Sequence, residues 1–89
     1  MFRVRWAQAA LDELTTLWIQ ASSGLRLSIT AATVQVDWQL QIDPWGCSES
    51  RPGGRRVFFV SPLGITFRIE LDGQTVSVLR VWLFRRRAK

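Results

Sequence analysis

The hydrophobic period of this chain changes along its length, and that change limits the folds the chain can adopt. Residues 2–6 alternate apolar and basic side chains, which predicts a short strand with one buried face. Residues 7–21 instead carry apolar side chains at three-and-four spacing, the stripe of an amphipathic helix. Trp6 and Trp18 are expected in the core. Ser22-Ser23-Gly24 ends this helix, with Gly24 as a left-handed cap and a serine capping the next element.

Residues 25–43 fit two structures. Every second residue from Val34 to Ile42 is apolar, which taken alone predicts a strand. Apolar residues between Leu25 and Leu40 also fall on one helical face. A helix is favoured, because the stretch is far longer than an average strand of roughly 5–6 residues and no turn residue divides it. Asp43-Pro44 ends it, since the residue before a proline avoids the α region.

The remainder of the chain predicts a loop and three strands. Residues 45–54 are rich in glycine and proline, which is typical of a loop. Strands are expected at 55–60, 65–71 and 75–84, and Asp72-Gly73 marks a tight hairpin turn between the last two. The sequence therefore predicts a single α+β domain over residues 1–89. In it an N-terminal strand precedes a two-helix hairpin, packed on one face of a mainly antiparallel four-stranded sheet.

Positive charge is concentrated in the strand-forming half. From Arg51 to Lys89 there are nine basic and two acidic residues, whereas the first 50 residues hold three basic and five acidic ones. A sheet rich in arginine suits a polyanion, because guanidinium groups bind phosphate oxygens in a fork and the field attracts the anion at long range. A nucleic acid or an acidic protein is therefore the expected partner.

Composition argues against several classes of protein. No apolar run approaches the roughly 20 residues that span a bilayer, so no membrane partner is expected. The single Cys47 forms no internal disulfide, which fits the reducing cytoplasm. With no histidine and one cysteine, a zinc site is not expected. The Gly53-Gly54 loop lacks the spacing of a phosphate-binding loop, and no cofactor is predicted.

Several segments, taken in order, match one known arrangement. They are Val4-Arg5-Trp6 with Ala9 to Leu14, Ile29 to Asp43-Pro44, Arg55-Arg56-Val57, Pro62-Leu63 with Phe67-Arg68-Ile69, and Val76 to Trp82 with Arg85 and Arg86. In this order the chain resembles the RelE/ParE superfamily of small bacterial toxins from type II toxin–antitoxin pairs. The resemblance covers almost the whole chain, and it implies a helix for residues 25–43.

The resemblance also implies a function. In that family the concave face of the sheet is functional, and an antitoxin segment wraps the toxin. One branch enters the ribosomal A site and cleaves mRNA, whereas another inhibits DNA gyrase without nuclease chemistry. The expected function is that of a toxin that inhibits translation by binding the ribosome and mRNA, with an acidic antitoxin as its partner. A gyrase inhibitor and a degenerate, non-toxic homologue are the alternatives.

The chemistry of RNA cleavage limits which residues of this chain can be catalytic. RNA cleavage needs a base, a group that stabilises the phosphorane and an acid, and arginine supplies only the second, because its pKa is too high. Related nucleases use His, Tyr, Lys or Glu, but this chain has no His or Tyr and its one lysine is Lys89. The expected catalytic residues are Arg68 and Arg86. The expected binding residues for nucleic acid or antitoxin are Arg55, Arg56, Arg80, Trp82 and Arg85.

Each of these side chains also has a purely structural interpretation. An arginine on a solvated face packs its stem on neighbouring residues without binding a ligand. Trp82 fits a base-stacking role, but packing in the core or against an antitoxin is the favoured interpretation. Glu70 fits a proton acceptor or a salt bridge to an arginine on the next strand.

Overall fold

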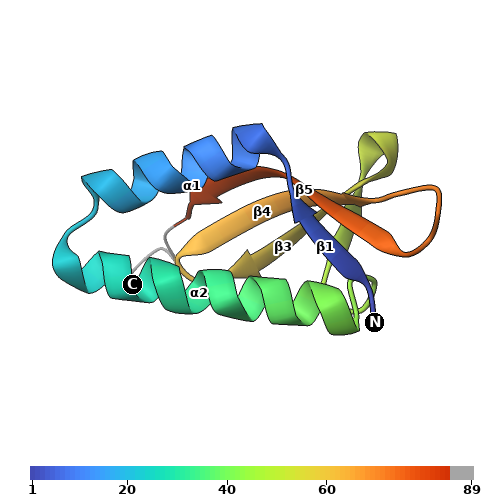
Figure 1. The fold of residues 1–89 in the computed structure, drawn as a ribbon, viewed down its shortest axis with the longest axis horizontal. Helices are drawn as coiled ribbons and strands as arrows, with labels where there is room; N and C mark the ends of the chain where they lie inside the picture. The colour runs from blue at the N-terminus through green and yellow to red at the C-terminus, as the bar shows by residue number, and fades with distance from the viewer. Residues whose placement is uncertain (85–89) are drawn as a thin grey trace.

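A computed structural model of the chain describes residues 1–84. Strand β1 (Arg3–Trp6) leads into a hairpin of two helices, α1 (Gln8–Gln20) and α2 (Ser23–Ile42) (Figure 1). The second half contains β2 (Glu49–Arg51), a single 3-10 turn η1 (Pro52–Gly54), β3 (Arg55–Val60), β4 (Leu63–Ile69) and β5 (Thr75–Leu83). The predicted α+β class is confirmed, and the ambiguous stretch from residue 25 onward is helical.

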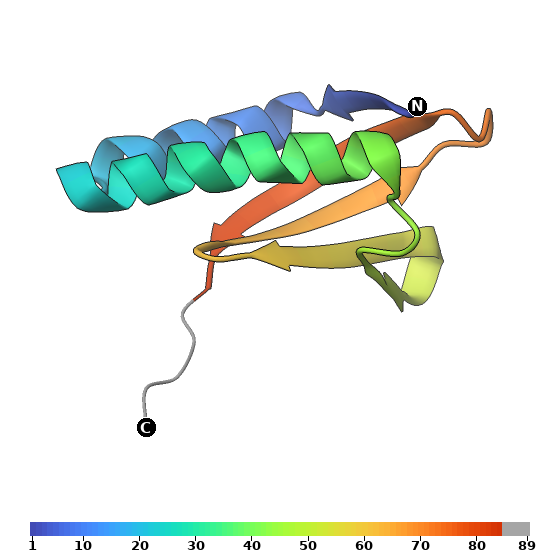
Figure 2. The same cartoon turned by 90° about the horizontal axis from the view of Figure 1, so that it is seen from below.

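The strands form one sheet in the order β1-β5-β4-β3-β2. Strand β1 is parallel to β5, and the other neighbours are antiparallel. The sheet has five strands where four were expected, because Glu49–Arg51 of the predicted loop pairs with residues 55–57 as β2. Figure 2 shows both helices on one face of the sheet, while the elements of residues 1–84 leave the opposite face uncovered. We call this uncovered side the open face.

The core lies between the helix layer and the sheet. The α2 side chains Ile29, Val36 and Leu40 are at most 1% exposed, and they pack with Phe67 of β4 and Val78 of β5. The apolar stripe of α2 thus packs against the apolar side chains that alternate along β4 and β5, as the helical period and the strand period predict. Each such aliphatic or aromatic side chain contributes about 1.5–3 kcal/mol when it leaves water.

The corner between the helices corrects two expectations. Ser22 caps α2, with its Oγ accepting from the Leu25 amide at 3.2 Å, but Gly24 lies inside that helix and caps nothing. Arg26 instead closes α1, donating to the carbonyls of Trp18 and Ile19 at 2.8 Å each. Its guanidinium also lies 4.5 Å from the Trp18 ring centre. The Trp18 side chain is 43% exposed at this corner, so the prediction that it lies in the core was wrong.

Across the part of the chain that the structure describes, neither helix combines the length and the apolar character needed to cross a bilayer.

Candidate nucleic-acid interface

A row of arginines crosses the open face from strand to strand. Residues paired across neighbouring strands point to the same side of a sheet. Arg51 of β2 pairs with Arg55 of β3, and the register that joins Arg56 to Phe67 places Arg55 opposite Arg68 of β4. Arg68 pairs with Ser77 of β5, and Ser77 pairs with Arg5 of β1. We call Arg51, Arg55, Arg68, Ser77 and Arg5 the arginine row.

The arginine row has the dimensions and exposure of a binding surface. Neighbouring strands lie about 4.8 Å apart, so five strands extend the row over roughly 19 Å. All four arginines are exposed, whereas Ser77 is fully buried between them. The Ser77 hydroxyl has no hydrogen-bond partner within residues 1–84. A polar group that is buried without a partner costs free energy.

Arg68 lies at the centre of the row and has one acidic neighbour. Its Nη2 is 3.6 Å from Oε2 of Glu70, which directly follows the end of the same strand rather than lying on the next strand as expected. At this distance the contact is an ion pair without a hydrogen bond, and the Glu70 oxygen has no hydrogen-bond donor in the described part of the chain. The Arg68 side chain remains 49% exposed, so its guanidinium is accessible to an anion.

Charge is divided between the two layers of the fold. The helices carry Asp12, Glu13 and Asp37 against a single arginine, Arg26. The open face instead carries the arginine row and Arg3, which pairs with Thr75. A field with opposite signs on its two faces orients an approaching polyanion toward the sheet.

A bulge decides which way Arg80 and Trp82 point. In the β4–β5 pairing, Phe67 lies opposite Val78 but Thr66 lies opposite Arg80, so Leu79 is an additional residue on β5. The bulge reverses the alternation, which moves Arg80 and the residues after it by one position. Unbroken alternation would place Arg80 on the core side of the sheet with Val78. The bulge instead places Arg80 on the opposite side.

Arg80 is committed to the helix layer rather than to the arginine row. Its Nε donates to Oε2 of Glu13 at 2.8 Å, and the amide of Val81 donates to Oε1 of the same carboxylate at 2.9 Å. Strand β1 ends at Trp6, so on that side this part of β5 has no neighbouring strand among the described residues, and Glu13 accepts from the backbone amide of Val81 at the open edge. The structure thus separates Arg80 from Arg68, although their strands are adjacent as predicted.

Trp82 belongs to an aromatic cluster on the open face. It pairs with Gly64, and its ring centre lies 6.1 Å from that of Phe59 in an edge-to-face arrangement. Phe59 makes a second edge contact with Phe84 at 5.0 Å. The cluster is partly exposed and spans β3 to β5, separated from the arginine row by the Val57–Thr66 pair. Aromatic faces of this kind stack on unpaired bases.

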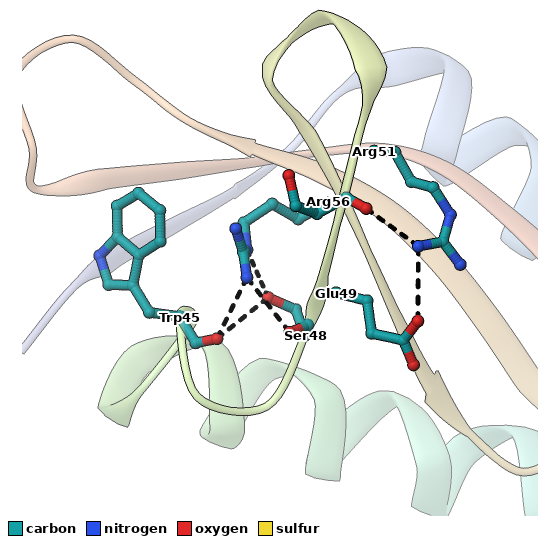
Figure 3. Close-up of polar contacts among 6 residues, drawn as sticks. Trp45, Ser48, Glu49, Arg51 and Arg56 are labelled. Atoms are coloured by element: carbon teal, nitrogen blue, oxygen red, sulfur yellow. Dashed lines mark hydrogen bonds and ion pairs between the residues drawn. The ribbon is translucent and has the colours of Figure 1, made fainter.

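Arg56 has a structural role. It pairs with Phe67 on the helix side of the sheet, opposite to the arginine row. Figure 3 shows its guanidinium turned into the loop that follows α2, where it binds Ser48 Oγ at 2.6 Å and the carbonyls of Ser48 and Trp45. It also lies 5.0 Å from the Trp45 ring centre. The expected binding residue Arg56 is therefore engaged in holding this loop, whereas Arg55 is exposed.

The predicted residues Arg85 and Arg86 lie outside the described residues. Within residues 1–84 the open face offers arginines, two glutamates and aromatic rings, with no histidine, lysine or tyrosine. Cys47 is no activated nucleophile, because burial and the nearby Asp43 raise the pKa of its thiol. No cluster of metal-ligating side chains is present in the described chain. This surface is suited to anion binding and poorly suited to proton transfer.

Sequence reasoning missed Arg5, Arg51 and Ser77. Arg5 joins the row only because β1 runs parallel beside β5, and Arg51 joins through a strand that was expected to be loop. The alternation of basic and apolar residues from Arg3 to Trp6 was the one available signal, since it indicated a solvent-facing basic side of β1.

Comparisons with known proteins identify the fold. No protein-family model and no curated protein matches the chain. Among solved structures, it resembles a chain of the toxin–antitoxin complex RelBE2 from Mycobacterium tuberculosis, with a TM-score of 0.71, 21% identity, and coverage of 93% of this chain and 98% of that one. The chromosomal ParDE system of P. aeruginosa gives a TM-score of 0.72 and 19% identity, covering 96% and 98%.

A third similar structure is the intact E. coli RelBE complex, with a TM-score of 0.60, 16% identity, and coverage of 97% of this chain and 100% of that one. The likeness extends over nearly the full length of each neighbour, so the same elements occur in the same order. The expected resemblance to the RelE/ParE superfamily is confirmed in the fold.

Proposed function

Because the chain has the fold of the RelE and ParE toxins, we propose that it is the toxin of a type II toxin–antitoxin pair that inhibits translation in the cytoplasm. The arginine row is the observation that carries this proposal. Guanidinium groups bind phosphate oxygens in pairs, and four of them on one exposed line fit an extended phosphodiester chain such as mRNA in a ribosomal site.

Binding rather than cleavage accounts for inhibition in this proposal. Arg68 stabilises a developing phosphorane, and Arg86 has the same chemistry at the end of the chain. Neither arginine removes the proton from a 2′-hydroxyl, because a guanidinium group is a donor only and not a general base. Glu70 and Glu49 are the open-face carboxylates in the described chain. Any cleavage is therefore slow, and blockage of the site by the bound protein is the main effect.

The partner in the intact pair is an antitoxin with an acidic segment. The open face combines exposed arginines with the aromatic cluster at Trp82, a composition that binds a peptide with both carboxylates and apolar side chains. Such a segment covers Arg68 and Trp82 and thereby competes with RNA for one surface. Arg80 contributes less than Arg68 to this contact, because Glu13 already holds it.

The test measures RNA affinity and translation with one set of purified variants. Arg5→Ala and Arg68→Ala each remove one phosphate contact, and each is expected to weaken binding of a single-stranded oligoribonucleotide about tenfold. The slope of log K against log salt falls by about 0.7 for each lost contact. Gln20→Glu changes net charge by the same amount on the exposed end of α1 and is the matched control.

Inhibition of a purified translation system should follow RNA affinity across these variants. Wild-type protein that leaves translation intact would contradict the proposal. So would an Arg68→Ala variant that binds RNA and inhibits as well as Gln20→Glu does. The same reactions report on cleavage, because the mRNA is recovered and its length is compared with that from untreated ribosomes.

Inhibition of DNA gyrase is the second candidate function. It is favoured by the scarcity of proton-transfer groups on the open face of the described chain, since a protein-binding inhibitor needs no catalytic residues. A supercoiling assay run beside the translation assay distinguishes the two functions. Lost supercoiling with normal translation would replace the first proposal with this one.

A further inference from the structure

The outer surface of α2 carries a second apolar stripe, which is largely exposed in the described part of the chain. It consists of Leu27, Ala31, Val34, Trp38 and Ile42, and we call it the outer ridge. Steps of three and four residues place these side chains on one line along a helix, opposite the stripe that faces the core. Leu27 is 75% exposed, Val34 66%, Trp38 53% and Ile42 49%.

The outer ridge has no charged residues to keep it solvated. The only charged side chains of α2 are Arg26 and Asp37. Arg26 is bound to the carbonyls at the end of α1. Asp37 accepts from Trp6 Nε1 at 3.3 Å and from Gln41 Nε2 at 2.7 Å. A helix face with large apolar side chains and no charge is typical of an interface.

We propose that the outer ridge binds the outer ridge of a second copy of this chain, with the two α2 helices antiparallel. The ridge is complementary to itself in this arrangement. A two-fold axis near Val34 places Leu27 beside Ile42 of the second copy, and Ala31 beside Trp38 of the second copy. A small residue thus faces a large one, as close helix packing requires. The antiparallel direction also opposes the two helix dipoles.

The size of the ridge indicates how strong this dimer is. Its exposed apolar surface is on the order of 500 Å², comparable with the largest patch on a typical monomer. Burial of the ridge on both copies removes about 1,000 Å², at the lower limit for a specific interface. Trp18 of α1 lines a groove together with Val34 and is 43% exposed, so it extends the contact. We expect a reversible dimer with a Kd in the micromolar range.

Sedimentation equilibrium of the purified chain between about 1 and 200 µM tests this inference. The wild-type mass is expected to rise with concentration from the 10.2 kDa of one chain toward twice that value. Val34→Glu places a charge at the centre of the ridge and should remain at the mass of one chain throughout. The control is Leu71→Glu, the same kind of change at a fully exposed leucine in the β4–β5 turn, which should dimerise like wild type.

Val34 is exposed, so its substitution leaves the fold intact, and circular dichroism of each variant verifies this. A wild-type chain that keeps the mass of one chain at all concentrations would overturn the inference. A Val34→Glu variant that associates like wild type would also overturn it. A monomer whose ridge is instead covered by a neighbouring gene product, or by lipid vesicles, would show that the occupant is not a second copy.

Discussion

Trp82 lies flat against the backbone of Gly64 on the neighbouring strand, and a Cβ built at Gly64 would lie 2.6 Å from the indole Cε2. The two residues are paired across β4 and β5, so the glycine provides the space in which the indole rests. Phe59 closes the same space from the other side with an edge contact at 6.1 Å. The aromatic cluster of the open face therefore depends on a missing side chain.

Gly64→Ala should destabilise the protein by about 1–3 kcal/mol, because the added methyl group displaces the indole from a well-packed site. Chemical denaturation monitored by tryptophan fluorescence measures this loss. Gly24→Ala is the matched control, since a Cβ there meets nothing within 4 Å and the residue lies in α2. Alanine at that position should stabilise the helix, by up to about 1 kcal/mol. Equal effects at both glycines would contradict the packing argument.

Glu13→Ala should cost about 1–3 kcal/mol of unfolding free energy, because it leaves the Val81 amide without its acceptor. Glu13→Gln keeps one acceptor oxygen for that amide and should lose less. Hydrogen exchange of the Val81 amide should accelerate in the alanine variant. Asp12→Ala is the control on the same helix, since among the described residues the Asp12 side chain accepts only from the exposed Gln8. If exchange at Val81 stayed unchanged, Glu13 would not be closing the edge of β5.

Arg56→Lys should loosen the loop after α2, although the charge is retained. The guanidinium makes three hydrogen bonds to Ser48 and Trp45 in a planar fork, which an ammonium group cannot reproduce. We expect a loss of about 1–2 kcal/mol and faster proteolysis between residues 44 and 50. Arg55→Lys, on the open face, should leave both quantities unchanged. Equal proteolysis of the two variants would remove the structural role assigned to Arg56.

Asp72 should make the β4–β5 hairpin sensitive to acid. Hydrogen bonds from the Gln74 amide, the Thr75 hydroxyl and the Thr75 amide lower the pKa of this carboxyl below its ordinary value. Since the folded pKa is the lower one, the stabilisation is complete above the unfolded pKa of about 3.9 and disappears as the pH falls through the folded value. Urea unfolding of wild type and Asp72→Asn from pH 2 to 6 should show a stability difference that shrinks toward low pH. A constant difference would be inconsistent with the lowered pKa.

Local pattern was sufficient for most of the fold. The three-and-four spacing of residues 7–21 predicted α1, and Asp72-Gly73 predicted the β4–β5 hairpin, because both signals depend on neighbours in sequence. The helix over residues 25–42 was less certain, since its two apolar stripes together mimic strand alternation from Val34 to Ile42. The helix has two apolar stripes because one packs on the sheet, whereas the other is the exposed outer ridge.

The sequence by itself determined the helices, all strands except β2, and the order of these elements. The tertiary structure alone decided which arginines lie on one line across the sheet. Arg5 meets Ser77 and Arg68 only through the parallel register of β1 on β5, and Arg80 leaves the core side only because Leu79 bulges. Alternation along one strand fixes the relative direction of its side chains. Which side chains become neighbours depends on pairing between segments that are distant in sequence, and no local pattern records that pairing.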